Sequence, residues 1–171
     1  IQPIHKFKQR VSLAEGLVNK GISVEAFERG LDALSQFAMH LRDFSPERVR
    51  VVATHSLREA NNRKKFIHAA RQLLPFPIEV ISGREEARLI YLGVAQAVPF
   101  RGVRLIIDIG GGSTEFAVGQ GEIPEILLSK SFGSLVVSER FFAKGKITEK
   151  RFHKAILSVK QELEPFSKQL K

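Results

Sequence analysis

The sequence predicts an α/β fold in two lobes, and two observations support this prediction. In residues 1–98, apolar residues at helical spacing alternate with short apolar runs typical of strands. After residue 98, three strand-like runs follow one another, and the chain ends in two helical patterns. Such alternation is typical of α/β proteins, and 171 residues that are 43% hydrophobic suffice for one substantial core or two small lobes. We therefore predict a first lobe over residues 1–98 and a second over residues 99–171.

The first lobe begins with a loosely alternating stretch at residues 5–13, which predicts a strand. Ser23 is a typical N-cap residue, and the apolar residues after it recur at helical spacing, which predicts a helix over residues 24–43. The further elements predicted here are a strand over 49–54, a loop or short helix over 55–60, a helix over 62–74, a strand over 78–81 and a helix over 83–97.

The second lobe is predicted to open with a hairpin. An apolar run leads into residues 108–115, which read Asp-Ile-Gly-Gly-Gly-Ser-Thr-Glu, and a second apolar run follows. This is the pattern of a strand, a tight turn and a strand. The elements predicted after the hairpin are a third strand near 126–132, a helix over 134–142 and a last helix capped by Thr148.

The triple glycine of this hairpin, Gly110, Gly111 and Gly112, indicates a ligand-binding turn. Consecutive glycines let a backbone turn with positive φ and approach a ligand without a Cβ in the way. Successive N–H groups in such a turn form an anion-binding concavity. Asp108, at the end of a buried-looking strand, is a natural ligand for a hard cation held by phosphates. The alternative is a plain hairpin turn, which usually needs only two or three residues such as Asn-Gly.

Two glutamates stand in the first turn of the helix predicted over residues 83–97. Ser82 and Glu85 have the spacing of a capping box, which gives Glu85 a structural role. Glu86 lies about 100° further round the helix and can face elsewhere. The favourable interaction of a carboxylate with a helix N-terminus explains only in part why a glutamate stands at position 86. The sharper hypothesis is that Glu86 is a general base for a water molecule.

A further polar group follows the strand predicted over residues 49–54. Functional groups collect at the carboxyl ends of such strands, and the guanidinium of Arg58 can bind two phosphate oxygens. His55 is a catalytic candidate by residue type, although a lone histidine after a strand is more often structural. The other histidines show no metal-ligand spacing.

Composition narrows the classes of function. The 27 Lys and Arg against 18 Asp and Glu give a net charge of +9, which favours polyanionic partners. A basic surface that is merely solvated is an equally good explanation of this charge. No specific nucleic-acid-binding module is recognisable, and no apolar run approaches the ~20 residues needed to span a bilayer. The absence of cysteine fits a reducing compartment. We therefore expect a cytoplasmic protein.

Four segments, in order and spacing, resemble motifs of the exopolyphosphatase and guanosine pentaphosphate phosphohydrolase family. They are residues 9–17, 54–60, 81–89 and 108–115. The resemblance covers nearly the whole chain. It implies an actin-like fold of two ribonuclease-H-like lobes, with mixed sheets, flanking helices and an active site in the cleft between the lobes. It also implies hydrolytic release of the terminal phosphate from inorganic polyphosphate and, in some members, from guanosine pentaphosphate.

The resemblance implies a role for each site residue. Glu86 takes the position of the catalytic general base, and Arg58 that of the phosphate-binding arginine. Asp108 and Glu115 take the acidic positions associated with the cofactor, Mg²⁺ or another divalent cation. The phosphate-loop positions fall on Gly110, Gly111, Gly112 and Ser113.

The resemblance further implies that the chain is part of a longer protein. The family's N-terminal hairpin, which carries its first phosphate loop, has no counterpart before Ile1, and its second lobe continues past Lys171. Both lobes would then be incomplete, and we expect the isolated chain to release little or no phosphate. The preferred substrate and the oligomeric state, a homodimer included, are left open.

Two other classes of function remain open at this point. A non-catalytic actin-like sensor could bind a phosphate or nucleotide ligand and signal by lobe closure. An actin-like kinase could use ATP, which the triple-glycine loop alone permits. Lost turnover with retained binding in Glu86→Gln would identify an enzyme, and ADP formed with a cosubstrate would identify a kinase.

Overall fold

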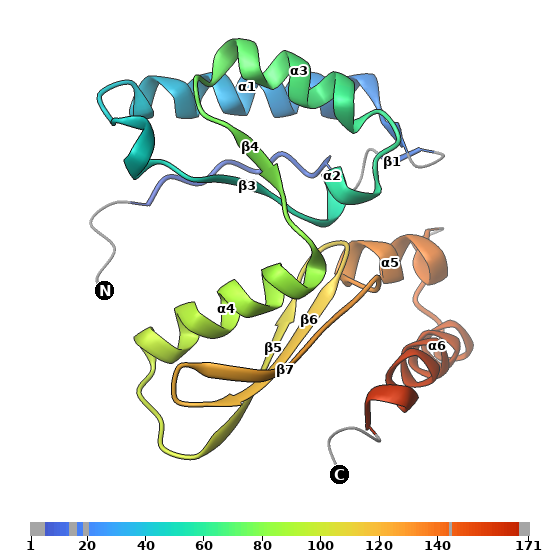
Figure 1. The fold of residues 1–171 in the computed structure, drawn as a ribbon. Coiled ribbons are helices and arrows are strands. Elements are labelled where there is room, and N and C mark those ends of the chain that lie inside the picture. The colour runs from blue at the N-terminus through green and yellow to red at the C-terminus, as the bar shows by residue number, and fades with distance from the viewer. Residues whose placement is uncertain (1–5, 14–16, 19–20, 144, 168–171) are drawn as a thin grey trace.

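The computed structural model describes residues 6–13, 17–18, 21–143 and 145–167. Its first part contains β1 (Leu17–Val18), β2 (Gly21–Ile22), α1 (Val24–Leu41), the 3₁₀ helix η2 (Pro46–Arg48), β3 (Val51–Ala53), α2 (His55–Glu59), α3 (Arg63–Leu73) and β4 (Ile78–Val80). Its second part contains α4 (Gly83–Ala97), β5 (Val103–Ile109), β6 (Thr114–Gln120), β7 (Ile123–Lys130), α5 (Ser134–Phe142) and α6 (Glu149–Ser167). Figure 1 shows the two parts one above the other, joined between β4 and α4.

The first part packs two helices on a small parallel sheet. β3 and β4 pair in parallel, with Val51 opposite Ile78, and α1 and α3 lie side by side over them (Figure 1). Because α2 contributes Leu57 to the core, burial rather than its own length stabilises this short helix. The core cluster consists of Ile22, Ala26, Leu57, Ala60, Phe66 and Ala70.

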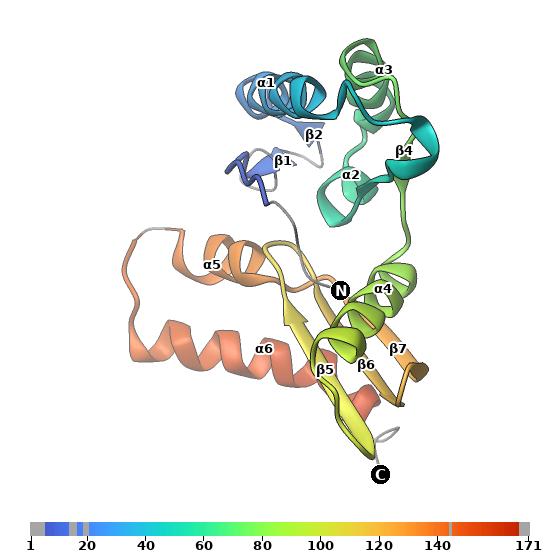
Figure 2. The ribbon, with the colours of Figure 1, turned by 90° about the vertical axis from the view of Figure 1, so that its left-hand side faces the viewer.

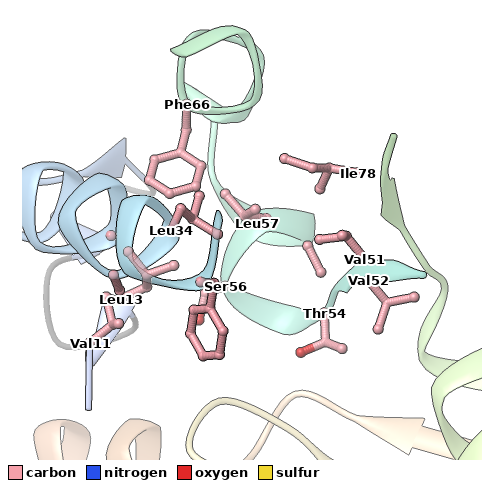
Figure 3. A pocket seen from close by; sticks show the side chains of 14 residues that line it. Val11, Leu13, Leu34, Val51, Val52, Thr54, Ser56, Leu57, Phe66 and Ile78 are labelled. Atoms are coloured by element: carbon pink, nitrogen blue, oxygen red, sulfur yellow. The ribbon is translucent and has the colours of Figure 1, made fainter. Parts of the chain in front are cut away.

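An apolar cavity of about 250 Å³ lies between α1 and β3. Figure 3 shows Leu34, Phe66 and Leu57 around it, from α1, α3 and α2 respectively, with Val51 and Val52 of β3 beside them. None of the described residues that line it is titratable. The cavity therefore offers no acid, base or charge, and the candidates for chemistry lie elsewhere.

The second part is a three-stranded antiparallel sheet between helices. β6 is its central strand. α4 covers one face through Tyr91, which is fully buried and donates its hydroxyl to the carbonyl of Gly121 at 3.1 Å. α6 covers the other face, where Phe166 packs on Phe116 with ring centroids 5.1 Å apart. Figure 2 shows these two helices on opposite sides of the sheet. Because side chains alternate along a strand, the odd-numbered residues of β6 face α4.

Several predicted elements are confirmed. The helices over residues 83–97 and 134–142 have the predicted bounds, and three consecutive strands follow α4. The hydroxyl of Thr148 accepts a hydrogen bond from the N–H of Arg151 at 3.3 Å, as expected of the cap of the last helix. None of the described helices is long and apolar enough to cross a membrane.

One strand prediction is wrong, and another has its start in the wrong place. The strand expected over residues 5–13 does not form over the described residues 6–13, where no neighbouring strand supplies a ladder. β7 begins at Ile123, earlier than the predicted residue 126, because Gly121 has a φ of 58° and completes a tight turn directly after β6.

β5 differs from its prediction in burial. The sequence reads as a buried strand, but β5 pairs only with β6 among the described strands. Leu105, Ile107 and Ile109 are between 49% and 69% exposed. An apolar run cannot distinguish an edge strand from a central one. The lobe boundary after residue 98 stays a prediction, and α4, which precedes it, packs on the sheet that follows it.

Candidate active site

The triple-glycine loop joins β5 to β6 and is held by the N-terminus of α5. The N–H of Gly110 donates to the carbonyl of Ser113 at 3.0 Å, which closes the turn. The N–H groups of Ser134 and Leu135 donate to the carbonyls of Gly110 and Gly111, both at 2.9 Å. The first turn of α5 therefore occupies the carbonyl side of the loop.

Three backbone N–H groups of the loop are open in the sense that no group of the described residues accepts a hydrogen bond from them. In the part of the chain that the structure describes, the N–H groups of Gly111, Gly112 and Ser113 have no hydrogen-bond acceptor. Gly112 and Ser113 are buried, and a buried donor without an acceptor costs about 1–3 kcal/mol. An anion can satisfy successive donors of this kind together.

The glycines of the loop are needed for close approach rather than for backbone conformation. None of the three has a φ between +20° and +160°, so the expectation of positive φ is wrong. A Cβ built on Gly112 would overlap the imidazole of His55. One built on Gly111 would lie 3.1 Å from Cδ1 of Leu135. Position 112 therefore has no room for a side chain.

Three polar side chains form a row across the sheet on the face that α4 covers. Asp108 of β5, Glu115 of β6 and Ser129 of β7 stand opposite one another in the strand register. Glu115 is 2% exposed and accepts a hydrogen bond from the hydroxyl of Ser129 at 2.8 Å. Asp108 is exposed. Directly opposite residues have Cβ atoms about 4.5–5.5 Å apart, so the two carboxyl groups are neighbours on one face.

Ser129 is a residue of this site that sequence reasoning missed. A Cβ built on Gly83, the first residue of α4, would overlap the Ser129 hydroxyl. The hydroxyl is therefore confined between the start of α4 and the carboxylate of Glu115. Only the register of β6 against β7 links Ser129 to Glu115, and a single sequence carries little signal for register.

Glu86 and Arg58 form a mostly buried ion pair between the two parts of the chain. Nη1 of Arg58 lies 3.2 Å from Oε2 of Glu86 and donates to the carbonyl of Ile81 at 3.0 Å. The side chains of Arg58 and Glu86 are 21% and 15% exposed. The pair joins α2 to the first turn of α4, so the structure brings these two predicted site residues together.

The capping box at the start of α4 is only half formed. Ser82 accepts a hydrogen bond from the N–H of Glu85 at 3.1 Å, as the sequence predicts. The carboxylate of Glu85 does not close the box, because it forms two bonds of 2.7 Å with Arg88. A guanidinium is a stronger partner for a carboxylate than a neutral N–H, and the bond to Arg88 lowers the pKa of Glu85.

The surroundings raise the pKa of Glu86. Burial is the main cause, and the negative charge of Glu115 adds to it. Arg58 and the hydroxyl of Thr54 act in the opposite direction without cancelling the rise in pKa. A carboxyl group with a raised pKa is better matched to general-base work near neutral pH.

His55 packs against the glycine loop. The side chain is 8% exposed, its ring lies on Gly112, and burial lowers its pKa. His55 and Arg58 are three residues apart on α2, so they lie on the same side of that helix. Two side chains from one turn of α2 therefore contact two different parts of the site: His55 contacts Gly112, and Arg58 pairs with Glu86.

The donor set for a metal ion is small. Among the described residues, no group of three or more His, Cys, Asp or Glu side chains could hold a metal ion. Mg²⁺ keeps several waters and is usually bound by one or two carboxylates plus substrate phosphates. The neighbouring carboxyl groups of Asp108 and Glu115 fit that mode and do not fit an all-protein cage.

Residues 1–171 match the Ppx/GppA phosphatase family. The chain belongs to this family. Two proteins of Vibrio cholerae serotype O1, each named guanosine-5'-triphosphate,3'-diphosphate pyrophosphatase, are 44% identical to it over 166 residues. The match covers 96% of this chain and 33% of each relative. The chain therefore spans about a third of the length of these curated relatives.

Solved structures agree with this membership in the Ppx/GppA family. An exopolyphosphatase-like protein matches with a TM-score of 0.86 and 28% identity, over 92% of this chain and 51% of that protein. An exopolyphosphatase from Cytophaga hutchinsonii matches with a TM-score of 0.75 and 29% identity, over 91% of this chain and 53% of that protein. The Aquifex aeolicus PPX-GPPA enzyme matches with a TM-score of 0.72 and 28% identity, over 92% of this chain and 53% of that protein. The predicted actin-like α/β fold, with mixed sheets and flanking helices, is confirmed.

Glu86→Gln is expected to raise the melting temperature of this Ppx/GppA family member near neutral pH. A carboxyl group whose folded-state pKa is raised contributes stability below its unfolded-state pKa, and that contribution is lost as the pH rises through the folded-state pKa. Glutamine stays neutral, so the two proteins should differ at about pH 7 and converge at about pH 4. Thermal unfolding of the full-length protein across this range measures the effect.

Glu85→Gln is the matched control, because the pKa of Glu85 is lowered and the expected change in melting temperature therefore has the opposite sign. This variant should melt below the wild type near neutral pH. A Glu86→Gln variant that melted below the wild type at the same pH would contradict the raised pKa of Glu86.

Ser129→Ala is expected to destabilise the full-length protein by about 1–3 kcal/mol, because the buried Glu115 loses its hydroxyl donor. Chemical denaturation measures the change in the free energy of unfolding. Ser131→Ala, an exposed serine just after β7, controls for the loss of a hydroxyl as such. Equal effects of the two substitutions would argue against the Ser129 to Glu115 bond.

Proposed function

We propose that this chain carries the catalytic centre of a phosphoanhydride hydrolase, which releases the terminal phosphate of inorganic polyphosphate or of guanosine pentaphosphate by attack of water. The observation that carries the proposal is the mostly buried carboxylate of Glu86, paired with Arg58 beside a loop with open amides. Membership in the phosphatase family supports the class of reaction. Relatives named guanosine-5'-triphosphate,3'-diphosphate pyrophosphatase and exopolyphosphatase support the two substrates.

In this proposal the loop and Arg58 bind the terminal phosphoryl group. The free N–H groups of residues 111–113 face no protein acceptor among the described residues and would donate to phosphate oxygens. Nη1 of Arg58 is engaged by Glu86 and Ile81. Within the described part of the chain, Nε and Nη2 of Arg58 have no acceptor and remain available for the phosphate.

Glu86 would accept the proton of the attacking water. Arg58 holds Oε2 of its carboxylate, and the hydroxyl of Thr54 also acts on this group, so the carboxylate would be fixed in place to orient the water. General-base catalysis of this kind contributes about 10²–10⁴-fold. Phosphoryl transfer needs positioning and charge neutralisation more than covalent help from the protein, and the site offers both.

Asp108 and Glu115 would hold the divalent cation. When bound, Mg²⁺ neutralises charge on the phosphate oxygens. The exposure of Asp108 leaves room for the waters that this ion keeps. Glu115 lies on the same face by the strand register, and the hydroxyl of Ser129 holds one of its oxygens.

Glu86→Gln in the full-length protein is expected to lower kcat by about 10²–10⁴-fold, because the general base is lost. Binding of inorganic triphosphate, measured by calorimetry, should persist, since the loop and Arg58 are unchanged. Glu85→Gln, one residue away and bound to Arg88, should retain turnover. Undiminished phosphate release by Glu86→Gln would contradict the role of Glu86 as the base.

The choice of substrate is tested by a comparison of phosphate release from inorganic polyphosphate and from guanosine pentaphosphate by the full-length protein. We expect release from at least one of them. Release from neither substrate would overturn the proposal, and ADP formed from ATP with a cosubstrate would identify a kinase instead.

A further inference from the structure

We propose that His55 is a positioning residue for this hydrolysis: the edge of its imidazole rests on Gly112 and sets the distance between Arg58 and the triple-glycine loop. The inference rests on the proposed function, because it concerns the geometry of the same site. It requires no contact between His55 and the phosphate and no proton transfer by the imidazole.

The contact between the two residues is close and specific. A Cβ built on Gly112 would overlap Cδ2 of His55 and would lie 2.7 Å from Nε2 and 2.8 Å from Cγ. Three atoms of the ring therefore occupy the space that a side chain at position 112 would need. Among the described residues the imidazole has no hydrogen-bond partner, so it acts on the loop through its shape.

Both sides of the contact are fixed. On one side, α2 is anchored by Leu57, which is 5% exposed in the core of the first part. On the other side, the loop carbonyls are held by the start of α5. A Cβ on Gly133, just before α5, would overlap the backbone of Gly111, so the helix start and the loop are in direct backbone contact. Closely packed groups transmit displacements rather than absorb them.

The position of His55 on α2 connects this contact to the chemistry. Arg58 stands one turn further along the same helix and pairs with Glu86. If the imidazole is removed, α2 can approach or tilt toward the loop, so Arg58 loses its fixed distance from the loop amides and its pairing with Glu86 is disturbed. A misplacement of about 1 Å can cost about 10²-fold in rate.

The test is a double-mutant cycle in the full-length protein, with kcat and KM measured on the better of the two substrates. Gly112→Ala alone should lower kcat/KM by about 100-fold, and His55→Ala alone by about 10-fold, mainly in kcat. In the His55→Ala background, Gly112→Ala should cost no more than about 3-fold, because the overlap is gone.

Two glycines and one histidine provide matched controls. A Cβ on Gly93 would meet nothing within 4 Å, so Gly93→Ala should be neutral in both backgrounds. Gly133→Ala overlaps backbone, so its penalty should persist in the His55→Ala background. His68→Ala removes an exposed imidazole of α3 and should leave kcat unchanged.

The outcomes separate this inference from the proposed function. A wild-type protein without phosphate release overturns the proposed function and the positioning role that rests on it. An active wild type in which Gly112→Ala has the same penalty in both backgrounds overturns the positioning role alone. So does a His55→Ala variant that melts earlier but keeps its kcat. If Gly112→Ala alone fails to fold, His55→Ala must restore folding, and failure to do so overturns the inference.

Discussion

The site depends on two neighbouring carboxylates, of which only one is paired with a guanidinium. Glu115 is 2% exposed and is bound by the neutral hydroxyl of Ser129, while Glu86 is paired with Arg58. Burial of a carboxylate is costly unless it is paired and hydrogen-bonded, and here the negative charges outnumber the positive one. The pKa of Glu86 rises as a result. The buried carboxylate lowers the stability of the fold, but its raised pKa suits a general base that works near neutral pH.

Three side-chain contacts between distant segments hold this arrangement of charges. His55 lies on Gly112, Arg58 binds Glu86, and Ser129 lies under Gly83. Each contact involves the first turn of a helix or the end of a strand, where backbone groups and side chains converge. Because packed contacts of this kind deform little, the carboxylates and the loop amides are held at set distances before any ligand arrives. The short helix α2 supplies two of the three contacts, which explains why five residues matter so much to the site.

Local signals in the sequence predicted local structure well. The bounds of α4 follow from Ser82, whose hydroxyl accepts the N–H of Glu85, and this interaction spans only three residues. The triple glycine likewise located the turn between β5 and β6 correctly, because this signal is also confined to a few consecutive residues. The strand expected over residues 5–13 failed because a strand needs a partner that the pattern itself does not reveal. Ser129 was missed because its relation to Glu115 exists only in the register between β6 and β7.

The triple glycine shows how a correct prediction can rest on an incorrect reason. The sequence predicts glycines for positive φ, yet none of the three has it. Gly112 makes room for His55, and Gly111 for the side chain of Leu135. These reasons lie in α2 and α5, on opposite sides of the loop and far from it in sequence. A glycine that serves a turn could be replaced wherever another residue tolerates the same φ, but a glycine that serves a neighbour can change only when that neighbour changes. The requirement for glycine in this loop is therefore a property of the packed site rather than of the turn.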